Sequence, residues 1–336
     1  MTLKAMYPAL VAAALVFAGA QARAEVDEIR AAQQYGLSSL PLMIMEDQKL
    51  VEKHAKAQGL DGVKVTWLRL GGPGAMTEAL VSGDLHFGSG GVPSLVTLWA
   101  RTKGTAMEVR GVGGIVNMPM ELLTVNPKVK TIRDFTDADK IAVTTIKVSN
   151  QALLLQMAAA KEWGSEHFDK LDSLTVSLPH PDAMATLASG SNVISAHFSA
   201  LPFQYRQKQD PKVHKIISSY EILGGPASNT VAYTTKTFHD ANPKAYAAFA
   251  AALKEAIDII NADKRAAAET YKRLTNTKET VEELTAIISD PDVQMTFIPS
   301  QTMNMATFMA KTGRIKAAPA AWTDLFFDSV KGLPGS

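Results

Sequence analysis

The sequence has no cysteine among its 336 residues. This absence excludes a disulfide-stabilised fold, a cysteine nucleophile and the lipid-modified cysteine at which a bacterial lipoprotein is processed. A chain of this length can instead bury a hydrophobic core large enough to be stable without cross-links. The sequence therefore predicts a protein without a lipid anchor that is stabilised by its core alone.

An excess of charge of one sign is also lacking, because 34 Lys and Arg residues stand against 33 Asp and Glu residues. The formal net charge of +1 argues against a surface for nucleic acid or for anionic membranes. After the first 24 residues, no apolar run is long enough to span a bilayer.

Residues 1–24 have the pattern of a secretory signal peptide. Lys4 gives a positive start, residues 5–20 form the apolar run AMYPALVAAALVFAGA, and small residues offer cleavage after Ala22 or Ala24. Loss of Lys4 and Arg23 with this leader would change the net charge from +1 to −1. We therefore expect an exported protein.

The glycine-rich stretch GDLHFGSGGVPS, residues 83–94, lacks the features of three known motifs. No Lys follows Gly91, as a phosphate-binding loop requires, and Pro93 stands where a dinucleotide fingerprint has its third glycine. Phe87 occupies the first glycine position of a nucleophile elbow around Ser89. Nucleotide binding and serine hydrolysis are both disfavoured.

Histidine is present at seven positions but without the spacing of a metal site, since no H-x-x-x-H pair occurs. We predict no metal and no other cofactor. His180 and His197 each follow a predicted strand, so we expect them to approach each other and to make ordinary hydrogen bonds.

Short β-branched runs alternate with amphipathic segments, which is typical of an α/β fold with parallel strands covered by helices. From Pro243 onward, Ala-rich helical spacing predicts an α-rich C-terminal part. The clearest expected strands are residues 63–70, 140–145, 174–179 and 230–238, and the clearest expected helices are residues 41–59 and 149–164.

One pattern occurs twice. LVSG at 80–83 and LASG at 187–190 are each followed by a strand, a loop and a helix that begins at a proline, Pro93 or Pro202. Gly83 and Gly190 are expected to end their helices in the left-handed conformation. The repeat predicts two similar α/β lobes with a ligand cleft between their strand ends; chance recurrence of a common helix ending is the alternative.

The loops at the predicted strand ends are rich in small hydrogen-bond donors. Glycines 88, 90 and 91 leave backbone N–H groups uncovered where a helix begins, and a helix N-terminus attracts anions. For any one loop, an ordinary turn with a helix cap is the alternative. Together the loops predict a binding cleft with Ser38, Ser39, Gly72, Gly90 and Gly91 on one rim and Thr145, Ser149, Asn150, His197 and Phe198 on the other.

Four segments in order, residues 35–60, 72–100, 120–154 and 178–190, resemble the nitrate/sulfonate/taurine-type substrate-binding proteins of ABC transporters. The most specific parts are EALVSGDLHFG at 78–88 and TIRDF at 131–135. The resemblance covers nearly all of the chain after the leader.

The resemblance implies a two-lobed, type II periplasmic binding protein that captures a ligand without performing chemistry. Its first lobe would comprise residues 25–117 and 229–336, and its second lobe residues 118–228. Asn117 and Asn229 lie in the two segments that cross between the lobes and join the expected ligand-binding set. The implied partners are a small anionic or aromatic ligand and the permease and ATPase subunits, with the protein a monomer in the periplasm.

The sequence departs from the family pattern at Ser195 and His197, where many members have an acidic residue. Phe198, Phe203 and Tyr205 nearby offer a wall for a planar ligand, or else belong to the core. We therefore expect a small organic anion, either a sulfonate or an aromatic carboxylate, as the ligand.

Two other functions stay open at this stage. An exported enzyme of related fold would use His197 as a base and Ser149 as a nucleophile. A partner of a membrane sensor would deliver the ligand to a receptor instead of a permease.

Overall fold

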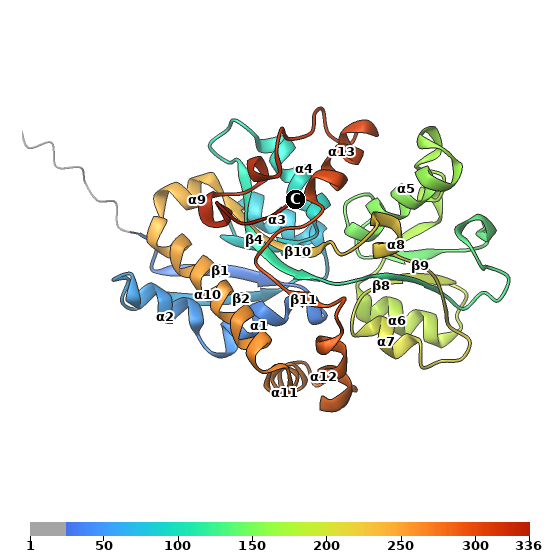
Figure 1. The fold of residues 1–336 in the computed structure, drawn as a ribbon, viewed down its shortest axis with the longest axis horizontal. Helices are drawn as coiled ribbons and strands as arrows, with labels where there is room; N and C mark the ends of the chain where they lie inside the picture. The colour runs from blue at the N-terminus through green and yellow to red at the C-terminus, as the bar shows by residue number, and fades with distance from the viewer. Residues whose placement is uncertain (1–24) are drawn as a thin grey trace, which may run out of the picture.

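The computed structural model describes residues 25–336, so the predicted signal peptide lies outside the described residues. The chain forms two β-sheets that lie side by side, each with helices packed around it (Figure 1). We call the part of the chain built on the six-stranded sheet lobe 1 and the part built on the five-stranded sheet lobe 2.

Lobe 1 takes its strands from both ends of the described chain. Its strand order is β11-β4-β10-β3-β1-β2. The strands are β1 (Glu28–Gln33), β2 (Lys64–Arg69), β3 (Phe87–Gly90), β4 (Val109–Asn117), β10 (Ser228–Thr235) and β11 (Gln294–Met295).

Lobe 2 takes all its strands from the middle of the chain, in the order β7-β6-β8-β5-β9. They are β5 (Glu121–Thr124), β6 (Ile141–Val143), β7 (Thr175–Ser177), β8 (Ala196–Ser199) and β9 (His214–Ser218). The chain therefore passes from lobe 1 to lobe 2 after β4 and returns before β10.

Helices connect the strands of both lobes and form the C-terminal part. Lobe 1 has α1 (Leu40–Asp47), α2 (Leu50–Ala57), α3 (Pro73–Ser82), α4 (Val92–Thr102), α9 (Lys236–Ala241), α10 (Pro243–Ala262), α11 (Lys264–Thr275), α12 (Val281–Ser289) and α13 (Thr302–Lys311). Lobe 2 has α5 (Asn150–Trp163), α6 (His180–Ser189), α7 (Phe203–Gln207) and α8 (Ser219–Leu223). The predicted α-rich C-terminal part is confirmed.

The sheets are mixed, where the sequence analysis expected parallel strands. The pairs β1·β2, β1·β3, β6·β7 and β6·β8 are parallel, whereas β10 and β5 run antiparallel to their neighbours. The antiparallel strands are those on either side of the crossings between lobes.

The helix expected over residues 41–59 is two helices. Lys49, between α1 and α2, has a left-handed backbone with φ of 51°, which interrupts the regular hydrogen bonding. The helix expected over 149–164 is α5, with Ser149 as its N-cap and Gly164 after its last residue. Gly83 and Gly190 are left-handed at the ends of α3 and α6, with φ of 83° and 66°, as predicted.

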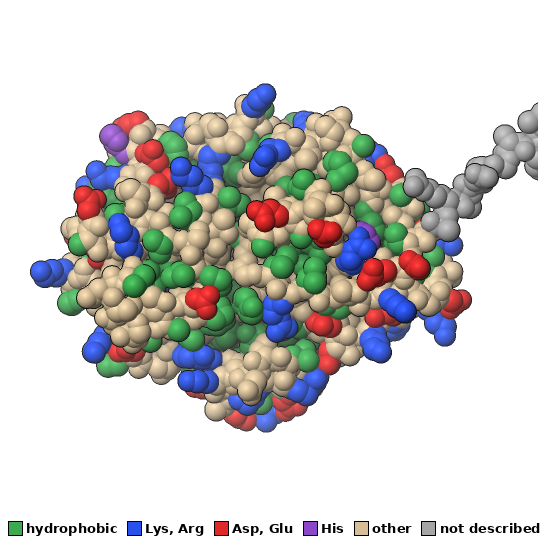
Figure 2. Space-filling model, turned by 180° about the vertical axis from the view of Figure 1, so that it is seen from behind, with side chains coloured by type: hydrophobic (Ala, Val, Ile, Leu, Met, Phe, Trp, Pro, Cys, Tyr) green, Lys and Arg blue, Asp and Glu red, His purple; other side chains and the backbone are tan. Residues whose placement is uncertain are grey.

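Aromatic packing holds the long helix α10 on the first sheet. The rings of Phe87 in β3 and Phe249 in α10 stack with centroids 3.8 Å apart. Within residues 25–336, no helix is long and apolar enough to cross a membrane. Figure 2 shows basic and acidic side chains interspersed over the surface of one face, in agreement with the balanced composition.

Candidate functional site

A small cavity lies where the two lobes meet and has about 30 Å³ of free space. It is bounded by the ends of strands and the beginnings of helices from both lobes. The lining residues are Gln34, Tyr35, Ser38, Pro73, Gly91, Met120, Thr144, Ser149, Asn150, Gln151, His180, Ala200, Asn229 and Thr230. Polar neutral side chains and backbone dominate this wall.

Four helices begin at the cavity. Pro73 is the first residue of α3, Gly91 and Ser149 are the N-caps of α4 and α5, and His180 is the first residue of α6. Each helix N-terminus carries partial positive charge on backbone N–H groups without intrahelical partners. Because these four termini converge on one small space, the cavity favours an anion.

The cavity reaches this polarity without a charged side chain, since none of its lining residues is Asp, Glu, Lys or Arg. Two buried amide atoms of lining residues have no hydrogen-bond partner within residues 25–336, Nδ2 of Asn229 and Oδ1 of Asn150. Thr230 Oγ1 donates to Asn229 Oδ1 at 3.0 Å, which leaves the Asn229 amide hydrogens as donors. A buried donor without a partner is costly, and an anionic ligand would satisfy it.

The lobes touch at the walls of the cavity. Asn150 lies so close to Gly91 that a Cβ atom added to the glycine would meet the Asn150 side chain well inside 3.0 Å. A Cβ on Gly72 would meet Thr144 O and Thr145 Oγ1 at 3.1 Å. Glycine at these two places lets the starts of α3 and α4 approach lobe 2 closely, at the segment after β6 and at the first turn of α5.

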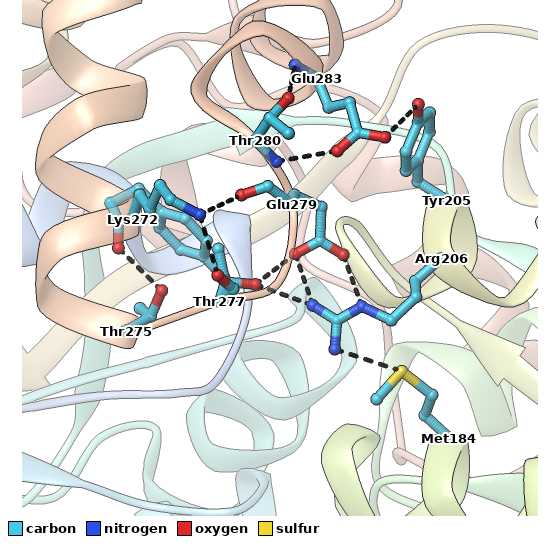
Figure 3. A network of polar contacts seen from close by, with 10 residues as sticks. Met184, Tyr205, Arg206, Lys272, Thr275, Thr277, Glu279, Thr280 and Glu283 are labelled. Carbon is cyan, nitrogen blue, oxygen red and sulfur yellow. Dashed lines mark hydrogen bonds and ion pairs between the residues drawn. The ribbon is translucent and has the colours of Figure 1, made fainter.

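A second contact between the lobes lies outside the cavity, where α7 meets the segment between α11 and α12 (Figure 3). Arg206 Nε and Nη2 donate to the two carboxylate oxygens of Glu279 at 2.7 and 2.5 Å. The Glu279 side chain is only 2% exposed. Burial alone would raise its pKa, but hydrogen bonds from Arg206 and Thr277 hold the pKa below its usual value. Tyr205 also reaches lobe 1, where its hydroxyl donates to Glu283 at 3.3 Å.

Two histidines lie side by side at the lobe 2 wall, as the sequence predicted. His180 Nδ1 and His197 Nε2 are 2.9 Å apart. Burial lowers the pKa of His180 to about 4. Burial and the neighbouring His180 lower the pKa of His197 well below its usual value. Both rings are therefore neutral at pH 7.

Of the twelve residues expected to bind ligand, five line the cavity: Ser38, Gly91, Ser149, Asn150 and Asn229. Gly72, Gly90 and Thr145 lie next to lining residues in the same loops, and Ser39 Oγ accepts a hydrogen bond from Gln34 N at 3.0 Å. Asn117 lies in the crossing between the lobes, where Ser228 Oγ donates to its Oδ1 at 3.1 Å. This bond ties the outgoing and returning segments together.

His197 and Phe198 lie behind the cavity wall. Both side chains are fully buried, and Phe198 belongs to the hydrophobic core. Phe203 in α7 stacks on His180 at 5.6 Å between ring centroids, and the Tyr205 hydroxyl contacts Glu283. None of the three aromatics expected to form a wall for a planar ligand lines the cavity, and Phe198 is in the core because both faces of the short strand β8 are covered.

The pairing of a histidine base with Ser149 is not assembled. The ring nitrogens of His197 contact His180 and Gln207. Ser149 Oγ instead accepts a hydrogen bond from the backbone N of Ala152 at 3.3 Å, as a helix cap does. Within residues 25–336, no group of three or more His, Asp or Glu side chains is placed to hold a metal ion.

Sequence reasoning missed nine lining residues: Gln34, Tyr35, Pro73, Met120, Thr144, Gln151, His180, Ala200 and Thr230. Four of the nine, Pro73, Thr144, Gln151 and Thr230, are immediate neighbours of predicted residues, so the correct loops were identified there but not every residue that lines the cavity. Gln151 and Thr144 are the two ends of the segment TTIKVSNQ, residues 144–151, and their side chains hydrogen-bond to each other at 3.2 Å. The sequence signal that could have identified Gln151 is a polar side chain in the first turn of a helix that begins at the expected cleft.

Comparison with known proteins supports the fold. No protein-family model matches the chain, and no curated protein matches it by sequence. Solved structures with the same fold include three periplasmic-type binding proteins. The alkanesulfonate-binding protein SsuA from Xanthomonas axonopodis pv. citri, solved with MOPS bound, has a TM-score of 0.68 at 19% identity over 88% of this chain and 96% of its own.

The other two are similarly distant. The periplasmic aliphatic sulphonate-binding protein SsuA from Escherichia coli has a TM-score of 0.62 at 15% identity, over 90% of this chain and 92% of its own. The periplasmic nitrate-binding protein NrtA from Synechocystis PCC 6803 has a TM-score of 0.64 at 16% identity, over 89% and 84%. The chain has the two-lobed periplasmic binding protein fold that the sequence predicted.

Proposed function

We propose that this protein is the solute-binding subunit of an ABC importer, which captures a small organic anion between its two lobes and delivers it to a permease. The observation that carries the proposal is the interlobe cavity, where four helix N-termini and a buried Asn229 amide without a partner converge. Shared fold with sulfonate- and nitrate-binding proteins supports it.

The chemistry of the wall supports a sulfonate or carboxylate as the ligand. Neutral donors and helix termini stabilise a charged group by directed hydrogen bonds, without an opposing side-chain charge that would have to be desolvated. The closed cavity has about 30 Å³ of free space, room for about one or two water molecules, so an organic ligand would enter only as the lobes separate. The protein then acts by binding and closure alone.

The lobes of the proposed subunit are residues 25–117 with 229–336, and residues 118–228. We propose that it acts in the periplasm as a monomer, with permease and ATPase subunits as its partners. Opening would separate the Gly91 and Asn150 surfaces, and ligand would hold them together. The ligand stabilises the closed form because it contacts both lobes at once.

Thermal shift and isothermal titration test the proposal against a panel of alkanesulfonates, aromatic sulfonates, nitrate, phthalate-type carboxylates and pyrimidines. A ligand at 100 times its Kd stabilises the folded protein by about 2.7 kcal/mol, which raises Tm by several degrees. Pyrimidines serve as the neutral comparison. If no anion in the panel raises Tm while a pyrimidine does, the proposed ligand class is wrong.

A further inference from the structure

A line of four buried side chains runs from the interlobe cavity to a second cavity, which is lined mainly by lobe 2 residues. Gln207, in α7, lines the second cavity and not the first. Its Oε1 lies 3.0 Å from His197 Nδ1, and His197 Nε2 lies 2.9 Å from His180 Nδ1. His180 Nε2 lies 3.1 Å from Gln151 Nε2, and Gln151 lines the interlobe cavity.

The orientations of the Gln207 and Gln151 side-chain amides together give each hydrogen bond along this line one direction. The amide oxygen of Gln207 can only accept, so His197 carries its hydrogen on Nδ1. A neutral His197 then has a lone pair on Nε2, which His180 Nδ1 must approach as a donor. A neutral His180 in turn accepts at Nε2 from the Gln151 amide.

The same order of donors and acceptors extends to Thr144, at the cavity wall. Because the Gln151 amide nitrogen donates to His180, the Gln151 Oε1 atom accepts from the Thr144 hydroxyl at 3.2 Å. The Thr144 hydrogen is thereby used within the wall, and its oxygen keeps lone pairs for the cavity. The second hydrogen of the Gln151 amide remains as a donor.

We propose that Gln207 is a positioning residue for the ligand site: it sets, through two neutral histidines, the orientation of the Gln151 amide and whether Thr144 accepts or donates toward the ligand. Turning the Gln207 amide over would place a donor against His197 and reverse all four bonds. Thr144 would then present its hydroxyl hydrogen to the cavity. The role toward a ligand rests on the proposed function, whereas the hydrogen-bond pattern does not depend on it.

The donor at Gln151 and the acceptor at Thr144 indicate which chemical group the adjacent end of the ligand carries. A wall that offers one amide N–H from the start of α5 and one hydroxyl lone pair from the residue after β6 complements a group that both accepts and donates. We infer that the end of the ligand next to Thr144 and Gln151 carries an N–H or O–H group, while the anionic group lies toward Asn229 and the start of α5. A bare oxyanion would leave the Thr144 lone pairs facing negative charge.

Nitrogen NMR of the ligand-free, 15N-labelled protein at pH 7 tests the arrangement directly. Long-range 1H–15N spectra should show both His180 and His197 neutral with the hydrogen on Nδ1, and a scalar coupling should join His180 Nδ1 to His197 Nε2. A hydrogen on Nε2 of either ring, or a charged ring, would overturn the proposal. Because no ligand is present, this result is independent of whether an anion binds.

Gln207→Met supplies the second arm, since methionine keeps the length of the side chain but removes the acceptor. We expect the His197 ring to lose its single tautomer and the Gln151 side-chain amide resonances to shift. Gln209→Met, an exposed position two residues away, should leave both unchanged. Circular dichroism establishes that each variant is folded. Unchanged Gln151 resonances in folded Gln207→Met would exclude the positioning role, and a Gln207→Met that does not fold leaves the wild-type spectra to decide.

Discussion

Asn150 Nδ2, in the first turn of α5, donates a hydrogen bond of 2.6 Å to the backbone carbonyl of Asn229 in β10. The first residue belongs to lobe 2 and the second to lobe 1, so this bond crosses the cavity wall from one lobe to the other. The Asn150 Nδ2 atom therefore joins the two lobes, while Asn229 Nδ2 has no hydrogen-bond partner in the described part of the chain. Asn150 therefore holds the lobes together, and the neighbouring Asn229 keeps an amide donor for a ligand.

Gly91→Ala should weaken ligand binding at least tenfold, because a Cβ atom there overlaps the Asn150 side chain. Gly91 has φ of −67°, which alanine adopts without strain, so the effect is steric and acts on closure. Titration of the best ligand in the panel measures it.

Gly74→Ala is the matched control, since its Cβ would meet Thr145 at an ordinary 3.5 Å. Equal affinities of the two variants would contradict the role of Gly91 in closure.

Asn229→Asp should abolish binding of an anion. The substitution keeps the shape of the side chain and the acceptor used by Thr230, but replaces the donor with a negative oxygen. Loss of about 1.4 kcal/mol already corresponds to a tenfold weaker Kd, and repulsion adds to it. Asn304→Asp, which makes the same charge change at an exposed position in α13, should bind as the wild type does.

Arg206→Met should destabilise the protein by about 3 kcal/mol, because it leaves the buried Glu279 carboxylate without its cation. Urea unfolding measures the change. A cycle with Glu279→Gln isolates the coupling between the two side chains. Lys236→Met, which breaks an exposed pair with Asp240, should cost less than about 0.5 kcal/mol. Additive effects of Arg206→Met and Glu279→Gln would show that the pair does not couple the lobes.

Stability should fall as the pH is lowered from about 6.5 toward 4. Burial holds the pKa of His180 at about 4 in the folded protein, below its usual value of 6.5, so the unfolded chain binds a proton that the folded protein excludes. The contribution of the neutral ring is therefore complete above the unfolded pKa and is lost as the pH falls to the folded one, by about 3 kcal/mol in total. Measurement of Tm between pH 6.5 and pH 4 tests this loss of stability.

His180→Gln should flatten part of that dependence, since a glutamine can accept from Gln151 and donate to His197 without titrating. An identical pH profile in the variant would mean that other groups cause the loss. The carboxylates with lowered pKa values, such as Glu279 and Asp139, lose their contribution to stability at a lower pH than His180 does.

The sequence located the loops of the site better than its side chains. Helix starts at Gly91 and Ser149 were readable because a glycine or serine before a helical pattern has a local cause. Phe198 was misplaced because the alternation of a four-residue strand does not reveal that both faces are covered. His180 was expected to approach His197, but its place in the cavity wall depends on where α6 begins in space.

By itself, the sequence determined the local features: an α/β chain with an α-rich end, two Gly-capped repeats, donor-rich loops and a balanced charge without cysteine. These follow from spacing, backbone preferences and composition, which act over a few residues. Only the tertiary structure decided which donors face one cavity, that Asn150 and Asn229 bridge the lobes, and that Gln207 reaches Gln151 through two neutral histidines. Such contacts join residues up to 79 positions apart, and their direction depends on burial, which no local pattern records.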